Sequence, residues 1–231
     1  MNKRSFISLA GISITGCAFK PLSILEGEKL LLPLDIKSMR PYEIGQTWTY
    51  KKLNFFNSLQ LEEIQERVAS ISPEVVIDRK SKNGKPLTPE ISRSQGQVTL
   101  DPYWDEEPTY STPMPLWPRY FDIGASINQT SPYKVANSSL TFWINMRCKV
   151  IGFETLSLTC GSFQTIKVES LIGLNHPDFS RHNYIRQNTM WISPAIGRWV
   201  VRETKGEYVN PSRRMNFRKD DYFRYELTDW S

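Results

Sequence analysis

The stretch that most constrains the fold is residues 140–150, where two kinds of side chain alternate without a break. One parity carries the apolar side chains Leu140, Phe142, Ile144, Met146, Cys148 and Val150. The other parity carries Thr141, Trp143, Asn145, Arg147 and Lys149. Because successive side chains of a strand point to opposite faces, this period of two predicts a β-strand with one face in a core and the other in solvent.

Further strands are expected in shorter segments along the rest of the chain. They lie at residues 45–50, 75–77, 97–100, 156–160, 165–169, 189–192, 198–204 and 222–227. Residues 59–71 fit either helical or strand spacing, and the strand signals on both sides favour a long hairpin with 75–77. Repeated short strands with turn residues between them predict a mainly β domain, built as a single antiparallel curved sheet or a half-open barrel.

Strand parity also predicts how the central strands pair. The apolar side chains stay on one face if the chain turns through three-residue loops at 153–155 and 161–163, which puts Glu154 at a hairpin tip. Cys148 then lies opposite Cys160, and two cysteines in an oxidising compartment favour a disulfide, worth ~3 kcal/mol in the chain-entropy model. Two buried thiols are the alternative interpretation.

The segment from Asp101 to Pro118 holds five prolines. We expect no regular element there, because proline lacks the N–H that helices and ladders use. It is interpreted as an ordered surface loop, or as a lid over a cleft. Its rings Trp104, Tyr110 and Trp117 are candidates for lining a ligand groove, since amphipathic aromatic side chains suit wet apolar sites. Packing in the core is the alternative for all three.

The N-terminus predicts export. Residues 1–4 are cationic, residues 6–14 are mostly apolar and small residues follow, which is the pattern of a secretory signal peptide. The apolar run is too short to span the ~30 Å of a bilayer's hydrocarbon core. Ile14-Thr15-Gly16-Cys17 resembles a bacterial lipobox, which implies cleavage before Cys17 and attachment of lipid, such as palmitate, to that cysteine. Plain secretion and a retained N-terminal segment are the alternatives.

These features divide the chain into three parts: a lipoprotein signal peptide at 1–16, the lipidated cysteine and a tether at 17–41, and the β domain at 42–231. Leu30, Leu31 and Leu32 are too apolar for a free tether, and we expect them to dock on the domain. The lipid would attach the protein to a membrane. Ala18 stands where an aspartate would resemble an inner-membrane retention signal, so we expect the outer membrane, with the protein facing the periplasm.

Charge and motifs exclude several classes of function. The formal net charge of +5 falls when Lys3 and Arg4 leave with the signal peptide, so it gives no case for a nucleic-acid partner. The chain lacks a Gly-x-Ser-x-Gly elbow and a glycine-rich phosphate loop. We therefore expect no enzymatic activity, no catalytic residue, no bound metal and no cofactor.

Three polar clusters leave alternatives open. His176, Asp178 and His182 have the donor types of a metal site and would make the protein a metal-assisted hydrolase. Adjacent carboxylates in Asp105-Glu106-Glu107 are candidates for acid–base chemistry. The basic stretch 213–219 suits anionic lipid headgroups. Solvated loops are the alternative interpretation of each cluster.

Three short motifs carry a resemblance to a known group of proteins. They are the Gly-x-x-Trp-x-Tyr strand at 45–50, Gly161-Ser162-Phe163, and the Trp-x-x-Pro strand at 191–197. Over residues 42–230 the chain resembles bacterial envelope proteins of unknown function related to the TapB-type proteins. Its strand pattern is also similar to the Lol-type lipoprotein carriers, whose half-barrels hold acyl chains. Neither resemblance implies a catalytic residue.

Together these features predict a cell-envelope lipoprotein that acts as a binding or assembly module. Its ligand would be apolar or a lipid, or its partner another envelope protein. A purely structural accessory lipoprotein with a filled core is the alternative.

Overall fold

The structure is a computed structural model that describes residues 22–23, 25–30, 39–211 and 216–231. The predicted signal peptide, Cys17, Ala18, Leu31 and Leu32 lie outside these residues, as does the part of the basic stretch at 213–215. In the described part of the chain, no helix is long and apolar enough to cross a membrane.

Within the described residues the chain forms thirteen strands. They are β1 (Glu28–Lys29), β2 (Thr47–Asn54), β3 (Gln60–Ser70), β4 (Val75–Ser81), β5 (Pro86–Ser94), β6 (Gln97–Leu100), β7 (Thr109–Pro115), β8 (Ser126–Lys134), β9 (Phe142–Leu158), β10 (Gly161–Leu174), β11 (His182–Ser193), β12 (Arg198–Asn210) and β13 (Asn216–Trp230). The predicted hairpin of residues 59–71 with 75–77 is confirmed as β3 and β4, which pair antiparallel.

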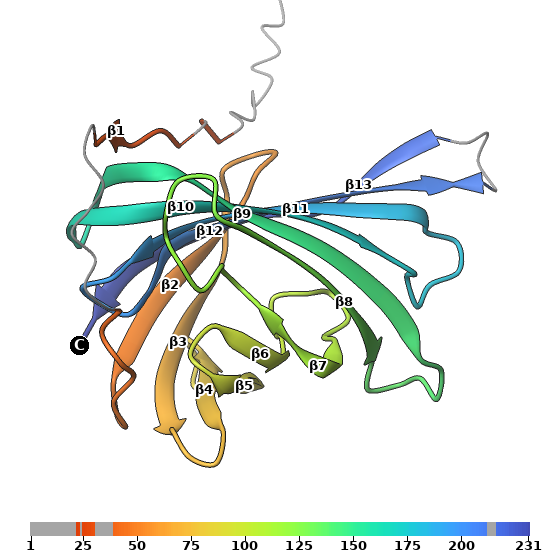
Figure 1. The fold of residues 1–231 in the computed structure, drawn as a ribbon, viewed down its shortest axis with the longest axis horizontal. Helices are drawn as coiled ribbons and strands as arrows, with labels where there is room; N and C mark the ends of the chain where they lie inside the picture. The colour runs from red at the N-terminus through yellow and green to blue at the C-terminus, as the bar shows by residue number, and fades with distance from the viewer. Residues whose placement is uncertain (1–21, 24, 31–38, 212–215) are drawn as a thin grey trace, which may run out of the picture.

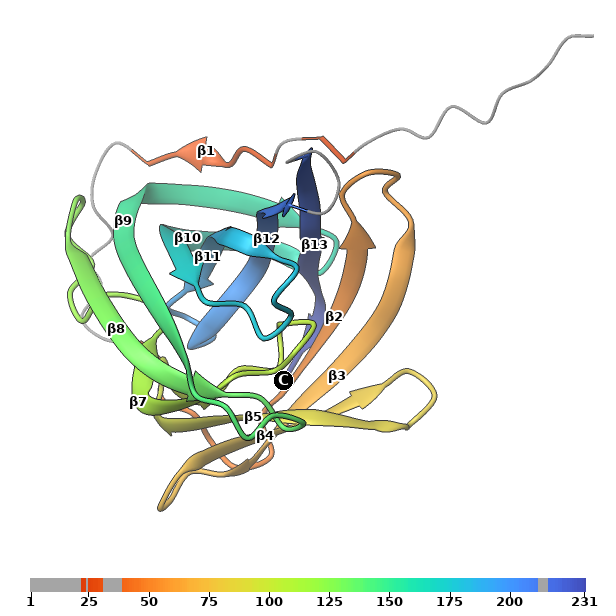
Figure 2. The same ribbon diagram turned by 90° about the vertical axis from the view of Figure 1, so that its right-hand side faces the viewer.

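Strands β2 to β13 form one ring in which each strand pairs antiparallel with the next. The ring closes where β13 pairs with β2, with Phe223 opposite Asn54 and Trp230 opposite Trp48. Figure 1 shows this ring from the side and Figure 2 after a quarter turn. The mainly β, antiparallel prediction is confirmed, but the sheet is a closed barrel of twelve strands, so the predicted curved sheet or half-open barrel is wrong. Closure protects both edges that an open sheet would expose.

The central strands form one long hairpin. β9 runs unbroken through Glu154, which pairs with Thr165 of β10 on one side and Lys29 of β1 on the other. The predicted turns at 153–155 and 161–163 are therefore wrong, and the chain turns at Thr159 and Cys160. The physical reason is a β-bulge where the register shifts between Lys167 and Val168, which changes the parity without a turn.

This register also separates the two cysteines. Cys148 lies opposite Ser170, whereas Cys160 sits in the hairpin turn. Both are free thiols, so the predicted disulfide is wrong in this structure. Burial raises the pKa of the Cys148 thiol to about 11, which keeps it protonated and unreactive.

The proline-rich segment differs from its prediction in two ways. Residues 109–115 form β7 despite Pro113 and Pro115, and β7 pairs with β8 only at Thr109 and Tyr110. Proline is tolerated there because few ladder bonds are needed from that strand. The start of the segment does not lie on the surface, since Asp101, Pro102 and Tyr103 are buried, whereas Asp105 and Glu106 are exposed.

Aromatic rings fill part of the barrel interior. Tyr50 stacks on Trp199 with ring centroids 4.1 Å apart and donates a hydrogen bond to the Trp199 carbonyl. Tyr103 packs edge-on against Trp199 and Tyr225 at 5.4 and 5.0 Å. The proline-rich segment thus contributes its Tyr103 ring to the core, where burial of such a ring stabilises the fold by roughly 2 kcal/mol.

The N-terminal segment crosses the outside of the barrel. The Leu22 N–H donates to the Phe55 carbonyl next to β2, and the Leu30 N–H donates to the Phe153 carbonyl of β9. Between them the Gly27 N–H donates to the Glu154 carboxylate at 3.3 Å. The side chain of Leu30 packs against the core, so its predicted docking is confirmed. The segment is therefore held at both ends across several strands.

Candidate binding site at the barrel mouth

One end of the barrel, which we call the mouth, carries the connections β2–β3, β4–β5, β6–β7, β8–β9, β10–β11 and β12–β13. All of them meet at one end because successive strands alternate in direction. The chemistry at this end depends on which polar side chains these connections bring together, and on what lies beneath them in the interior.

The interior beneath the mouth holds a cluster of paired charges. Arg198 of β12 donates to Glu66 at 2.6 Å, to Glu90 at 3.0 Å and to the Tyr42 hydroxyl at 3.1 Å. Arg79 donates to the other oxygen of Glu66 at 3.2 Å. All five residues are buried. Since buried charges are tolerated only when they are paired and hydrogen-bonded, this cluster ties β3, β4, β5 and β12 together.

A second buried pair holds the β6–β7 connection. Arg202 donates to the Asp101 carboxylate at 3.0 Å, and Asp101 also accepts from the Tyr103 N–H at 3.1 Å and the Trp104 indole N–H at 3.0 Å. Burial alone would raise the pKa of Asp101, but the charge and hydrogen bonds of Arg202 outweigh it and hold that pKa below its usual value. An ionised Asp101 therefore fixes the start of the loop.

Arg186 of β11 clamps the same loop from the other side. It donates to the Tyr103 carbonyl at 2.6 Å and to Asp221 at 2.8 Å, and its guanidinium lies 3.8 Å from the centre of the Trp104 ring. Burial raises the pKa of Asp221, and the charge of Arg186 offsets only part of this rise. Asp221 has a φ of 49°, so its backbone lies in the left-handed region at this bend of β13.

The clamped loop, residues 101–108, crosses the mouth and leaves a cleft on each side. The first cleft has a volume of about 420 Å³ and lies between the loop and strands β2, β4 and β13. Strands β3 and β5 also contribute to its wall. It is lined by Lys52, Glu62, Ile64, Arg79, Lys85, Pro86, Leu87, Thr88, Pro102, Tyr103, Trp104, Asp105, Glu107, Asp220, Asp221, Phe223 and Tyr225. The second cleft, of about 450 Å³, lies between the loop and residues 135–142 and 177–179.

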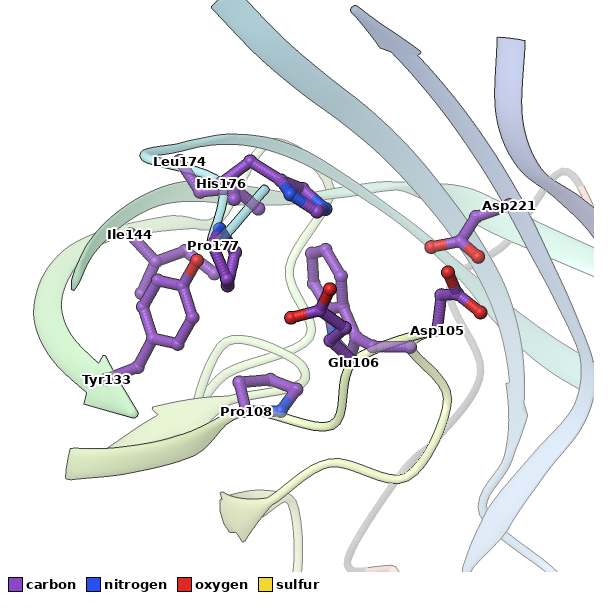
Figure 3. A pocket seen from close by; sticks show the side chains of 10 residues that line it. Asp105, Glu106, Pro108, Tyr133, Ile144, Leu174, His176, Pro177 and Asp221 are labelled. Carbon is purple, nitrogen blue, oxygen red and sulfur yellow. The ribbon is translucent and has the colours of Figure 1, made fainter. Parts of the chain in front are cut away.

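A small pocket lies between the two clefts (Figure 3). Its volume of about 20 Å³ is room for roughly one water molecule. Figure 3 shows the Tyr133 ring on one side and the carboxylates of Asp105 and Asp221 on the other, with His176 across from Glu106. Asp105 lines this pocket and both clefts, so the loop is the shared wall of the whole mouth.

Lys52 and Lys85 are the basic side chains of the first cleft that have no carboxylate within ion-pair distance among the described residues, and Lys52 is the partly buried one of the two. Its ammonium lies 4.0 Å from the centre of the Phe223 ring and 5.7 Å from that of Tyr225. Desolvation lowers the pKa of Lys52, although Glu62 opposes the shift. The neighbouring Lys51 is different, since it pairs with Glu226 at 2.7 Å. Lys52 is thus a partly desolvated cation available to a ligand.

Two clusters that the sequence offered separately meet at the mouth through Arg181. Its guanidinium lies 3.3 Å from Asp178 and 3.7 Å from Asp105, and it also donates to Asp220. Arg181 therefore joins the β6–β7 and β10–β11 connections to strand β13. Its cation neutralises part of the acidic rim, so these carboxylates form an ion-pair network instead of an open acid–base pair.

The predicted alternative of a metal site is not assembled. The His176 Nδ1 accepts from the Asp178 N–H at 3.0 Å, while its Nε2 faces Arg181 at 3.5 Å. Desolvation and the Arg181 charge lower the pKa of His176. His182 is exposed at the start of β11, opposite Val209. The described residues contain no group of three or more metal-ligating side chains.

The three predicted ligand-groove rings are not brought into one groove. Trp104 lines the first cleft and the small pocket. Tyr110 is buried opposite Tyr133, and Trp117 is buried at the far end of the barrel. The Trp117 ring lies against Gly96, where a side chain would not fit. Trp104 alone stays a candidate for contact with a ligand.

The arginines that position the loop are not among the site residues predicted from sequence. A signal for one of them exists, because Arg186 has the same strand parity as the buried Met190 and Ile192. A charged residue on the core parity of a strand predicts a buried ion pair. The partner, Asp221, is 35 residues away in sequence and no local pattern identifies it.

No family model matches the sequence, and no curated protein matches it either. Solved structures do resemble it. A protein from Bacteroides fragilis NCTC 9343, described as exported and with a YmcC-like fold, aligns with a TM-score of 0.54 at 15% identity over 84% of this chain and 99% of that one. A protein from Parabacteroides distasonis ATCC 8503, described as a lipoprotein, aligns with a TM-score of 0.52 at 14% identity over the same shares. At these identities the likeness shows a shared fold.

Proposed function

We propose that the protein is a lipid-anchored protein of the cell envelope that acts as a binding module. Two observations support the location. Residues 1–17 combine a signal-peptide pattern with a lipobox-like end. Two proteins with the same fold are described as exported or as a lipoprotein. The anchor is Cys17, and Ala18 favours the outer membrane with the barrel in the periplasm.

The observation that carries the binding proposal is the first cleft. Its volume of about 420 Å³ falls in the range of small-molecule sites. Lys52 offers a cation with no competing ion pair among the described residues, and Trp104 and Phe223 offer ring faces. Glu62 and Glu107 offer carboxylates for hydroxyl or ammonium groups. This set suits a small polar ligand that carries an anionic group.

The predicted apolar or lipid ligand would have to bind in the interior of the barrel, where the contacts do not favour it. An acyl chain inside the barrel would have to replace the rings around Trp199 or break the ion pairs of Arg198. Breaking such a pair leaves a buried charge uncompensated. The mouth offers ionised groups along its clefts, and so the proposed ligand is polar and stays outside the core. In this proposal the chain binds without catalysing a reaction.

The anchor is tested first by metabolic labelling. Wild-type protein should incorporate palmitate and fractionate with membranes, whereas a Cys17→Ser variant should not be labelled. Continued labelling of Cys17→Ser would contradict the anchor.

The site is tested by native mass spectrometry of the soluble Cys17→Ser protein, exported and purified gently. We expect an added mass that is lost on denaturation and is strongly reduced by a further Lys52→Ala change. Lys51→Ala is the matched control, because Lys51 is the neighbouring residue and pairs with Glu226 outside the cleft. An added mass that survives Lys52→Ala would place the ligand elsewhere, and a bare protein would favour the purely structural accessory lipoprotein.

A further inference from the structure

The outer face of strands β9 to β13 carries large apolar side chains that have no covering element among the described residues. Cross-strand pairing puts Gly173, Ile185, Glu207 and Lys219 in one row, because each lies directly opposite the next. A parallel row holds Arg147, Leu171, Gln187 and Lys205. Directly opposed residues of an antiparallel sheet share a face, so both rows lie on the same outer surface.

We define the flank patch by its exposed apolar residues Phe56, Trp143, Leu171, Ile185 and Phe217. Each keeps half or more of its surface exposed, and Phe217 keeps 78%. Phe56 stacks on Tyr222 at 5.1 Å, and the Lys219 ammonium lies over both rings. Gly173 has open space where a Cβ would be, so the patch is flat at its centre. Exposed apolar side chains gathered in this way mark a contact surface.

Cations accompany these apolar side chains. Arg147, Lys205 and Lys219 stand in the two rows, against a single acid in them, Glu207, which accepts a hydrogen bond from Tyr222. An apolar surface with basic side chains around it fits the interface of a bilayer that contains anionic lipid. The combination of apolar and basic side chains in the patch therefore matches the surface of a bilayer that contains anionic lipid.

The position of the anchor selects the same side of the molecule. Leu22 is hydrogen-bonded to Phe55, the residue before Phe56. Cys17 lies five positions before Leu22, and five steps of extended chain span at most ~18 Å. In both views β1, the β2–β3 loop and the β12–β13 hairpin lie along the upper side of the barrel (Figures 1 and 2). A lipid on Cys17 would hold this side close to the membrane.

We propose that the flank patch docks on the membrane surface, so that the barrel lies on the bilayer with the outer face of β9 to β13 against anionic headgroups. This inference rests on the proposed lipid anchor at Cys17 for its geometry. It gives a role to the flank-patch side chains, which neither pack in the barrel interior nor line the clefts at the mouth. One consequence is that the mouth opens along the membrane instead of away from it.

The test separates the patch from the anchor by using full-length Cys17→Ser protein, which lacks the lipid. Partitioning is measured by flotation with mixed vesicles of phosphatidylethanolamine and phosphatidylglycerol. We expect measurable binding that falls about tenfold or more in an Ile185→Ser/Phe217→Ser variant. Replacing phosphatidylglycerol by phosphatidylcholine should weaken binding several-fold.

The matched control is Ile44→Ser/Ile71→Ser, which removes two exposed isoleucines at the opposite end of the barrel. It should leave partitioning unchanged. Equal losses in both double variants, or no vesicle binding by Cys17→Ser protein, would overturn the docking proposal while leaving the anchor intact. Palmitate labelling of the wild type decides the anchor separately, and circular dichroism confirms that each variant is folded.

Discussion

Arg198 in the interior and Arg181 at the mouth each bridge several carboxylates, but in different surroundings. The side chains of Arg198, Glu66 and Glu90 are at most 3% exposed. The Arg181 partner Asp105 is 65% exposed. A buried charge that loses its partner cannot turn to water, whereas an exposed one can. The interior pairs therefore fix the shape of the barrel, and the mouth pairs are the ones that a ligand can displace.

We expect the largest loss of stability when the interior ion pairs of Arg198 are removed. Arg198→Met leaves Glu66 and Glu90 buried with one cation fewer, and we expect a loss of about 3–5 kcal/mol in the free energy of unfolding. Urea unfolding of the soluble Cys17→Ser protein measures it. A loss no greater than that of Arg181→Met would break the distinction between interior and mouth.

The next effect compares two buried aspartates. The pKa of Asp101 is lowered in the fold, so its carboxylate contributes stability above its unfolded pKa of ~3.9, and that stability is lost as the pH falls through the folded value. The pKa of Asp221 is raised, so any contribution of its protonated form is present below ~3.9 and is lost as the pH rises through the folded value.

At neutral pH we therefore expect Asp101→Asn to cost about 1.5–3 kcal/mol and Asp221→Asn clearly less. The gap between the two variants should narrow in acid, as Asp101 of the parent becomes protonated. Thermal unfolding across the pH range checks this. An equal cost for both variants at neutral pH would show that the two pairs are equivalent.

A smaller effect is expected from the mouth itself. Arg181→Gln should cost no more than about 1 kcal/mol, because two of its three carboxylate partners, Asp105 and Asp178, are exposed to solvent. The cost should shrink further in high salt, which screens such pairs. A cost that does not change with salt would indicate that the network is buried.

Replacing Lys52 should change stability in the opposite direction from replacing the arginines. Its pKa is lowered by desolvation, so at neutral pH the charged form lies in an unfavourable environment. We expect Lys52→Met to leave stability unchanged or to raise it by about 0.5 kcal/mol, while the matched Lys51→Met does not raise it. A clear loss in Lys52→Met would indicate a structural role for this lysine.

The smallest expected effect concerns the cysteines. Because Cys148 is free in the middle of β9 and Cys160 is free in the hairpin turn, a reducing agent should not change the unfolding midpoint. Thiol titration of the unfolded, unreduced Cys17→Ser protein should find both. A midpoint that falls on reduction would contradict the register of β9 and β10.

The strands could be predicted from sequence because period two is a local signal. Residues 142–150 of the predicted stretch form the first half of β9, whereas Leu140 lies before the strand and is exposed. How these strands pair with one another could not be predicted from the sequence. One bulge beside Lys167 reverses the parity on which the predicted turns depended. Closure of the barrel depends on β13 meeting β2 across most of the chain, and no nearby residue encodes that contact.

Part of the mouth can be predicted from the sequence. Residue type identifies His176, Asp178 and Asp105 as candidates, and the setting among prolines identifies Trp104. These side chains are brought together by Arg181 and by the burial of Asp101, which holds the start of the proline-rich segment in the interior while Asp105 stays exposed. Such long-range charge pairing leaves no periodic trace, and so sequence spacing alone could not place these residues together.

The claim that a ligand binds at the mouth while the interior only maintains the barrel is tested most directly by hydrogen exchange with mass spectrometry. Cys17→Ser protein would be compared as purified from the periplasm and after its bound molecule is removed in urea and the chain refolded. We predict faster exchange after removal in residues 101–108 and 175–181, with β10 to β12 unchanged. Faster exchange in β12 around Arg198, with the mouth loops unchanged, would contradict the account.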